Sequence, residues 1–147
     1  MTLLNSLRYI NLRIQTSKNL KYLGYHLNGT TINFKYIDII NKSDIHFNPC
    51  GYRRIPLYDF DNINVLLLEW NPKSRSLIHD HHDKGCISIL LKNQLSEDVY
   101  CNSTHKFLYT NILKIHEVNF VDNDKINHSV YNSCDNINSI SLHIYPK

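Results

Sequence analysis

Hydrophobic residues at the start of the chain follow a helical spacing. Five apolar side chains lie three or four positions apart, which places them on one face of an α-helix: Leu3, Leu4, Leu7, Ile10 and Ile14. Residues 31–41 follow the turn signal Asn28-Gly29, and we expect a second short helix there. This segment contains INFKYIDII, which is also rich in β-branched and aromatic residues, so a strand is the alternative.

From Cys50 onward the pattern changes to short apolar runs separated by polar turns. The runs predict eight strands, at residues 53–57, 63–70, 77–81, 86–91, 94–100, 111–116, 127–132 and 139–145. Asn93 lies between two of them, where a tight turn is needed, and asparagine tolerates the left-handed backbone conformation. Many short strands at regular spacing are typical of a β-sandwich or barrel.

The length of the chain fits one ordinary domain. Its 147 residues are 42% hydrophobic, which is enough to form a core and argues against disorder. Internal repeats, linkers and low-complexity tracts are absent from the sequence. We therefore predict a single, mainly β domain over residues 1–147, with a helical cap over about 1–45 and a barrel over about 50–147.

Charge and cysteine content narrow the possible partners and location. The formal net charge is only +3 and no long run of Lys or Arg appears, so we expect neither a nucleic-acid nor a membrane partner. The first residues lack a signal-peptide pattern, so we expect a cytoplasmic location. We also expect a monomer. In a reducing compartment the cysteines are expected to be thiols; these are Cys50, Cys86, Cys101 and Cys134.

The stretch IHDHHDKGC, residues 78–86, is the clearest chemical feature. On a strand, His79 and His81 would face the same side and His82 the other. An isolated His-x-His pair is most often a coincidence. Here it ends a predicted strand, and further histidines lie on later strands. A third metal ligand could come from one of four positions: His105, His116, His128 or His143.

A small barrel with a His-x-His motif resembles the cupins, whose fold is a jelly-roll β-barrel. The usual cupin pattern continues with a glutamate ligand a few residues later. This chain has Gly85 and Cys86 in that region, so its ligand set must be completed elsewhere.

Four motifs in order make the segment from Tyr52 to Tyr145 similar to cysteine dioxygenases, thiol dioxygenases of the cupin superfamily. The motifs are YRR at 52–54, IHDHHDKGC at 78–86, INHSVYNS at 126–133 and SISLHIY at 139–145. His128 and His143 are fifteen positions apart, as in that family. The resemblance covers about two-thirds of the chain.

The resemblance implies a role for each matching residue. His79, His81 and His128 would hold Fe(II), and imidazole ligands suit iron. Arg54 and Tyr52 would bind the substrate carboxylate, since a guanidinium forms bidentate pairs with carboxylates. Arg53, on the opposite face of the strand, would be a surface residue.

The last motif and the cysteine would complete the site. Ser141, His143 and Tyr145 alternate on one face of a strand, and the resemblance implies a relay in which Ser orients His and His orients the phenol. Cys86 and Tyr145 are the pair that animal members join by a thioether bond, so Cys86 would not be an iron ligand. A small buried thiol is the alternative for Cys86.

Three functions remain open from the sequence. The first is oxidation of L-cysteine to cysteine sulfinic acid with O2. The second is dioxygenation of another small thiol, 3-mercaptopropionate, although such enzymes usually lack residues corresponding to Arg54 and Cys86. The third is a metal-binding cupin without turnover. Animal members continue beyond the strand that ends the resemblance, so we expect a more open pocket here.

Overall fold

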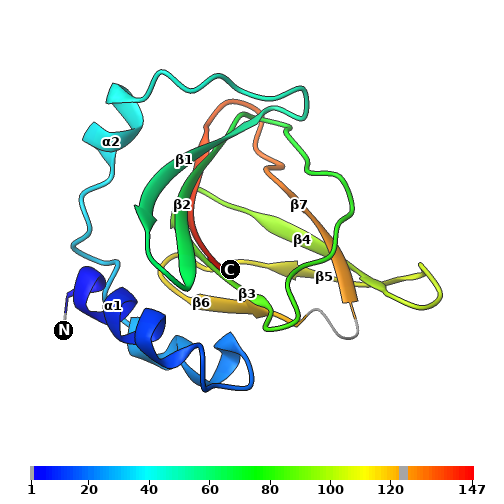
Figure 1. Ribbon diagram of the computed structural model, residues 1–147. Helices are drawn as coiled ribbons and strands as arrows, with labels where there is room; N and C mark the ends of the chain where they lie inside the picture. Colours follow the sequence, from blue (N-terminus) through cyan, green and yellow to red (C-terminus); the bar gives the residue numbers. More distant parts are fainter. Residues whose placement is uncertain (1, 123–125) are drawn as a thin grey trace.

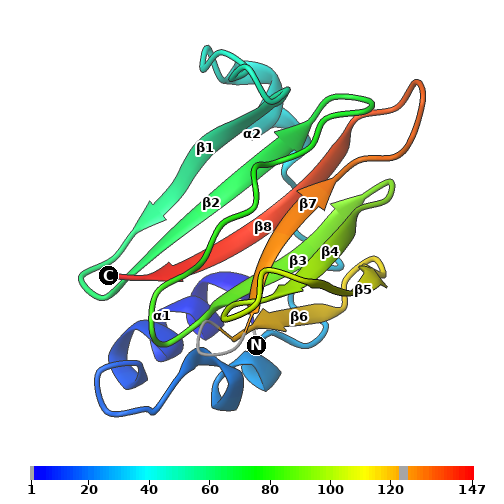
Figure 2. The same cartoon turned by 90° about the vertical axis from the view of Figure 1, so that its right-hand side faces the viewer.

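The computed structural model describes residues 2–122 and 126–147 as two β-sheets with a helical layer (Figure 1). The helices are α1 (Leu3–Arg13), η1 (Leu20–Tyr22), η2 (Gly24–Leu27) and α2 (Ile37–Lys42). The strands are β1 (Tyr52–Asp59), β2 (Ile63–Trp70), β3 (Cys86–Lys92), β4 (Ser96–Cys101), β5 (Phe107–Ile112), β6 (Val118–Val121), β7 (Ile126–Tyr131) and β8 (Ser139–Pro146). One sheet has the order β1-β2-β8-β3-β6 and the other β5-β4-β7, with antiparallel pairing (Figure 2).

Both predicted N-terminal helices are present, the second much shortened. Thr2 caps α1 by accepting a hydrogen bond from the Asn5 backbone N–H at 3.2 Å. The segment predicted over residues 31–41 becomes helical only at Ile37, because residues 31–33 form a turn. The strand alternative for this segment is therefore wrong.

Six of the eight predicted strands lie where the pattern placed them, within a few residues. β1 includes Pro56, which an edge strand tolerates because its outer side lacks ladder bonds. Asn93, between β3 and β4, has φ +65°, as its left-handed turn requires. All four cysteines are free, as predicted.

The other two strand predictions are wrong. Residues 77–81 form an irregular connection rather than a strand. The strand expected at 111–116 is β5, which begins at Phe107 and lies at a sheet edge with an almost fully exposed surface, so burial imposes no alternating pattern on it. The sequence pattern also missed β6, which is only four residues long.

The apolar core covers the outer face of the five-stranded sheet. There α1 and the two 3₁₀-helices pack on alternate residues of the central strands, such as Val65, Leu67, Leu142 and Ile144. Figures 1 and 2 show this helical layer below and behind the sheet. A smaller apolar cluster lies on the inner side and includes Leu68, Trp70, Leu90, Leu95, Leu113 and Val130.

Because the helices bury the outer apolar row, the inner row of the same strands is free to be polar. On β8, Ser141, His143 and Tyr145 alternate with the apolar residues that face the helices. The helical layer thus lets one sheet contribute both a core and a chemically active face.

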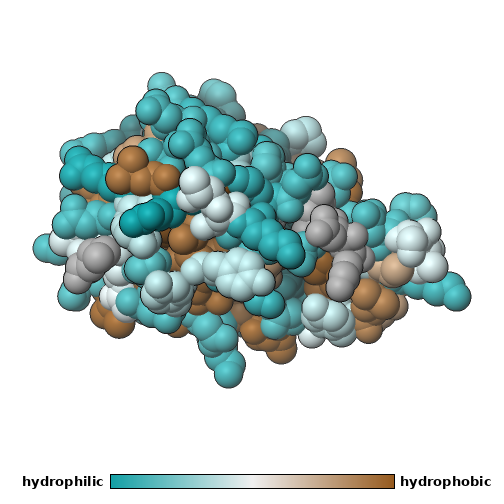
Figure 3. Space-filling model, turned by 60° about the horizontal axis from the view of Figure 1, so that its bottom comes forward, coloured by the Kyte–Doolittle hydropathy of each residue, from teal (hydrophilic) through white to brown (hydrophobic). Residues whose placement is uncertain are grey.

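The surface shown in Figure 3, the lower side of Figure 1, is mostly hydrophilic, with scattered hydrophobic residues. Within residues 2–122 and 126–147, none of the helices has both the length and the apolar character needed to cross a membrane.

The helical layer should contribute strongly to stability. Leu7 is fully buried in the outer core, whereas Leu12 on the same helix is 71% exposed. We expect Leu7→Ala to lower the free energy of unfolding by about 2–5 kcal/mol, from lost burial and a residual cavity. Leu12→Ala should change it by less than about 0.5 kcal/mol. Urea unfolding measures both, and equal effects would show that the layer is not part of the folding core.

Candidate metal centre

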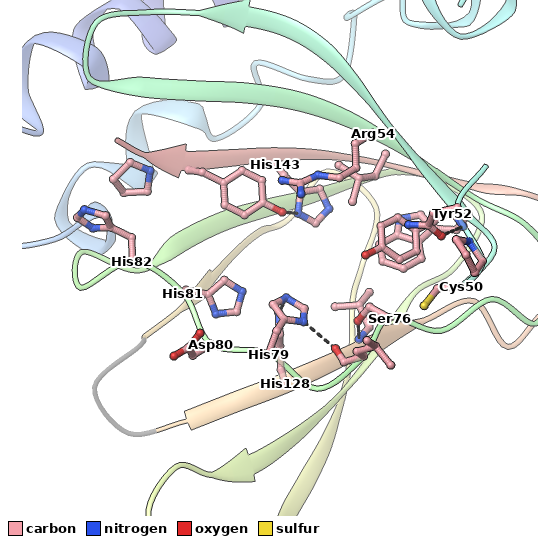
Figure 4. A pocket seen from close by; sticks show the side chains of 18 residues that line it. Cys50, Tyr52, Arg54, Ser76, His79, Asp80, His81, His82, His128 and His143 are labelled. Carbon is pink, nitrogen blue, oxygen red and sulfur yellow. Dashed lines mark hydrogen bonds between the residues drawn. The ribbon is translucent and has the colours of Figure 1, made fainter. Parts of the chain in front are cut away.

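A cavity of about 860 Å³ opens between the sheets and contains most of the predicted site residues. Figure 4 shows three imidazoles on one side of it and Arg54 and His143 across from them. The cavity is lined by residues of β1, β2, β7, β8 and the connection between β2 and β3. Tyr52 and Tyr145 also line it.

The connection that carries His79 and His81 runs beside β7 without forming a regular ladder. It touches β7 at two isolated bridges, Arg75 with Tyr131 and His79 with His128. Between them, hydroxyl groups take part in the pairing: Ser76 Oγ accepts from the Val130 N–H at 2.9 Å. His79 is thereby fixed by two backbone hydrogen bonds to His128, at 3.0 and 3.1 Å. The expected shared orientation of the two histidines thus arises without the expected strand.

His79, His81 and His128 form the group that could bind a metal ion. One ring nitrogen from each lies within 4.8 Å of the others. His128 is buried on β7, and the other two are half-buried. Among the four candidates for the third histidine, His128 is the one in this group. His82 was expected to face away; it lies apart from the three rings but still lines the same cavity (Figure 4).

The hydrogen bonds of two of these rings show that their lone pairs converge. His79 Nδ1 lies 2.8 Å from the Leu77 carbonyl oxygen, which can only accept, so Nδ1 carries the proton. His128 Nδ1 lies 2.8 Å from Glu97 Oε2 and is likewise the donor. In the neutral rings both Nε2 atoms are then unprotonated, and they face each other at 3.1 Å.

A cation between these nitrogens relieves their repulsion. Two imidazoles bound at right angles to one ion, with bonds of about 2.1 Å, have nitrogens about 3 Å apart. The observed separation of 3.1 Å fits this arrangement. The donor set therefore fits a first-row transition metal held by neutral histidines.

Two of the three clustered histidines, His79 and His81, resist protonation. Burial lowers the pKa of His79, and nearby His128 and Arg54 add to the effect. The pKa of His81 falls to about 2, first through burial and then through the neighbouring histidines. Neutral imidazole is the form that binds metals, so the fold keeps these ligands ready for an ion.

Glu97 on β4 is a buried carboxylate that our sequence reasoning missed. Its side chain is 6% exposed and accepts hydrogen bonds from His128, Asn111 and Asn119. Burial raises its pKa, but these hydrogen bonds outweigh burial and hold the pKa below the ordinary value. A signal was available: Glu97 and Val99 on β4 alternate with Leu95, which directly precedes the strand, so a carboxylate interrupts an inward apolar row.

The β8 residues form a hydrogen-bonded row that begins at Trp70. The Trp70 indole N–H donates to Ser141 Oγ at 3.0 Å, and this oxygen lies 2.7 Å from His143 Nε2. His143 Nδ1 lies 3.2 Å from the Tyr145 hydroxyl. The predicted sharing of one face by the three residues is thus observed, and Trp70 is an additional member.

The tautomer of His143 decides the direction of this row. An indole only donates, so Ser141 Oγ accepts from Trp70. Burial lowers the pKa of His143 to about 3, so its ring is neutral and carries one proton. With that proton on Nδ1, Nε2 accepts from Ser141 and Nδ1 donates to the Tyr145 oxygen, which leaves the phenolic proton to point into the cavity.

Arg54 and Arg53 face opposite sides of β1. Arg54 lines the cavity, and its guanidinium carbon lies 5.4 Å from the centre of the Tyr145 ring, a cation–π contact. Arg53 pairs with Glu69 at 2.8 Å and donates to three carbonyls at the end of α2 and beyond it. The prediction that Arg53 is a plain surface residue is therefore wrong, since its side chain is 10% exposed.

Cys86, at the start of β3, is buried outside the histidine group. Burial, reinforced by the charge of Glu97, raises its pKa to about 12, so it is a thiol and a poor metal ligand. Burial also raises the pKa of Tyr145. The register of β3 and β8 pairs Ile87 with Ile144, so Cys86 and Tyr145 are neighbours on adjacent strands. Gly85 has φ +77°, and a Cβ there would collide with the Phe120 ring. This turn therefore requires glycine.

The family model for cysteine dioxygenase type I matches residues 45–147. The chain belongs to this family. The match includes β1 through β8 and every residue of the cavity described above, and it leaves α1, η1, η2 and α2 outside. Membership supports a thiol dioxygenase-like protein with a three-histidine metal site.

Solved structures with the same fold are distant in sequence. The TT1209 protein from Thermus thermophilus aligns with a TM-score of 0.56 at 15% identity, covering 74% of this chain and 94% of that one. An RmlC-like cupin from Shewanella frigidimarina gives 0.55 at 12% identity, with coverage of 78% and 89%. A recombinant oxalate oxidase gives 0.54 at 14% identity, with coverage of 67% and 52%. These similarities show the cupin fold of this cysteine dioxygenase family member, as the sequence predicted.

The buried neutral histidines should make the metal-free protein acid-sensitive. Their folded pKa values lie below the unfolded value of 6.5, so below that pH the unfolded chain binds more protons. Stability should therefore fall as the pH decreases from about 6.5 to 4.5, by up to about 1.4 kcal/mol per pH unit for each such histidine.

Urea unfolding of the metal-free protein across this range measures the slope. His81→Gln should flatten it, whereas replacement of the exposed His46 by Gln should leave it unchanged. An identical slope for wild type and His81→Gln would contradict the assignment.

Proposed function

We propose that this protein is an Fe(II)-dependent dioxygenase that oxidises L-cysteine to cysteine sulfinic acid with O2. The observation that carries the proposal is the convergence of two imidazole lone pairs, 3.1 Å apart, in a cavity that also contains Arg54. Membership of the cysteine dioxygenase type I family supports the reaction type.

In this proposal His79, His81 and His128 hold the iron. All three are neutral ligands, so the iron keeps its full positive charge, which favours an anionic thiolate as a further ligand. When bound, the iron supplies the redox chemistry by which O2 reacts with the substrate sulfur.

Arg54 would bind the substrate carboxylate. Its guanidinium projects into the cavity opposite the histidines, where its fork can pair with both oxygens of a carboxylate (Figure 4). Tyr52 is two positions earlier on β1, and its ring packs on Trp70 with centroids 4.6 Å apart. This packing holds the Tyr52 phenol at the same wall, where it can add a hydrogen bond to the carboxylate.

Tyr145 would act as the hydrogen-bond donor beside the reacting sulfur. In the proposal the neutral His143 ring carries its proton on Nδ1, so the row from Trp70 through Ser141 and His143 donates a hydrogen bond to the Tyr145 oxygen. Its own proton is therefore directed elsewhere, toward the substrate. Burial raises its pKa, so it keeps this proton at neutral pH.

The thioether bond between Cys86 and Tyr145 is a further part of the proposal. Its formation joins Sγ to a ring carbon, removes two hydrogen atoms and reduces O2. Cys86 is buried and Tyr145 half-buried, and the pairing of Ile87 with Ile144 brings them together on adjacent strands, which supports a bond between them. The mass of the purified protein should fall by two hydrogens after incubation with iron, cysteine and O2, but not in Cys86→Ser.

Turnover is the primary test of the reaction. Anaerobically iron-loaded protein, given L-cysteine and O2, should consume O2 and yield cysteine with two added oxygen atoms by mass spectrometry. His79→Ala is the control, because it removes one ligand. Product no higher than in this control would overturn the proposal. Metal binding without O2 uptake would instead favour the cupin without turnover.

The role of Arg54 predicts a substrate-dependent defect. Arg54→Gln should lower kcat/KM for L-cysteine roughly 30-fold or more, because losing a charge-assisted bond costs about 2 kcal/mol. Cysteamine, which has the amine and thiol but no carboxylate, should be unaffected. A higher kcat/KM for 3-mercaptopropionate than for cysteine in the wild type would show that the second substrate is the better one. Equal losses for cysteine and cysteamine would contradict the role.

A further inference from the structure

Glu97 occupies a position where a carboxylate would normally be unfavourable. It lies on the inner face of β4, between the fully buried Leu95 and the 1% exposed Val99. Val99 is directly opposite His128 in the register of β4 and β7, so Glu97 is a diagonal neighbour of His128 on the same face. A buried charge persists only when hydrogen bonds and partners compensate for lost hydration.

The compensation comes from a network that spans several strands. Glu97 Oε2 accepts from His128 Nδ1 at 2.8 Å, and Oε1 accepts from the side-chain amides of Asn111 at 2.8 Å and Asn119 at 3.3 Å. Asn119 also donates to Ser88 Oγ on β3 at 3.3 Å. The carboxylate thus accepts hydrogen bonds from side chains of β5, β6 and β7. These bonds connect the two sheets next to His128, on the side of its Nδ1.

The histidines of the group differ in what fixes their Nδ1 proton. His79 donates to a neutral backbone carbonyl, that of Leu77. His128 donates to a full negative charge at the same distance of 2.8 Å. A carboxylate behind a ligating imidazole fixes its tautomer and makes its other nitrogen a stronger electron donor. His128 is therefore electronically distinct from His79.

We propose that Glu97 is a positioning residue for the metal centre, acting through His128 to orient this ligand and to bring one negative charge to a site with three neutral ligands. Most non-heme iron oxygenases bind a carboxylate directly. Here the region of the usual cupin glutamate has Cys86, and the carboxylate is instead one residue removed from the metal. This inference rests on the proposed metal site but not on turnover of any thiol.

The charge of Glu97, rather than its shape, is what the proposal requires. Glu97→Gln retains an oxygen that accepts from His128 but loses the charge. Asp98→Asn is the matched control, because Asp98 is the adjacent carboxylate on β4 and pairs with Arg75 at 3.0 Å, outside the cavity. A purely structural role for Glu97 would alter unfolding but not the electronic properties of the bound metal.

The experiment measures Co(II) affinity by competition with a chromophoric chelator, and the midpoint potential of the iron-loaded protein. We expect Glu97→Gln to weaken Co(II) binding roughly 10- to 100-fold and to raise the Fe(III)/Fe(II) potential, because less negative charge favours the reduced ion. Asp98→Asn should match the wild type in both. Wild-type affinity and potential in Glu97→Gln would overturn the proposal.

A second variant guards against misfolding. In Glu97→Gln the new side-chain amide would face the amide of Asn111. We therefore combine Glu97→Gln with Asn111→Asp. The new aspartate accepts a hydrogen bond from the glutamine and restores the negative charge, one residue further from His128. The double variant should regain wild-type thermal stability but bind Co(II) more weakly than wild type. Wild-type Co(II) affinity in this double variant would show that the carboxylate does not need to contact His128, and would contradict the proposed role of Glu97.

Failure of the proposed dioxygenase reaction would look different from failure of this inference. Glu97-dependent Co(II) binding without cysteine oxidation would leave Glu97 as a positioning residue in a metal-binding cupin. If the protein oxidises cysteine but its metal affinity and potential do not depend on Glu97, the proposed reaction is supported and the role of Glu97 is wrong.

Discussion

The rest of the site depends on two imidazole nitrogens that face each other at 3.1 Å with their lone pairs. Each ring is held from behind, His79 by the Leu77 carbonyl and His128 by Glu97, so neither can turn away to relieve the repulsion. Protonation would relieve it, but burial lowers the pKa of His79. A cation is the remaining stabilising partner, and the geometry around it is fixed before the ion arrives.

The five-stranded sheet forms the opposite wall of this site, and its two faces differ. The side that meets α1 and the 3₁₀-helices carries the apolar core, with Leu67, Leu142 and Ile144 among its residues. The inner side can then carry Ser141 and His143 without losing the hydrophobic stabilisation of the sheet. The N-terminal helices lie outside the family match, yet they cover the sheet that positions the cavity.

Much of this arrangement was predictable because alternation along a strand is a strong physical signal. The β8 row, Asn93 and the histidine group all follow from sequence spacing or motif order. The irregular connection at residues 77–81 was not predictable, because side-chain and isolated backbone bonds replace a ladder there. Glu97 was missed because its partners come from strands far apart in the sequence. The bounds of β5 were misplaced because an exposed edge strand lacks an apolar period.

Whether three histidines bind the iron is best measured by the iron K-edge X-ray absorption spectrum of the anaerobic, iron-loaded protein. Before substrate is added, we expect a shell of nitrogen and oxygen with imidazole scattering that weakens in His128→Ala. We expect no sulfur in this shell, since Cys86 is a buried thiol outside the histidine group. After L-cysteine is added, a sulfur at about 2.3 Å should appear, near the distance typical of metal–thiolate bonds. Sulfur in the first spectrum would show that a protein thiol binds the iron, and its absence from the second would show that the substrate thiolate does not.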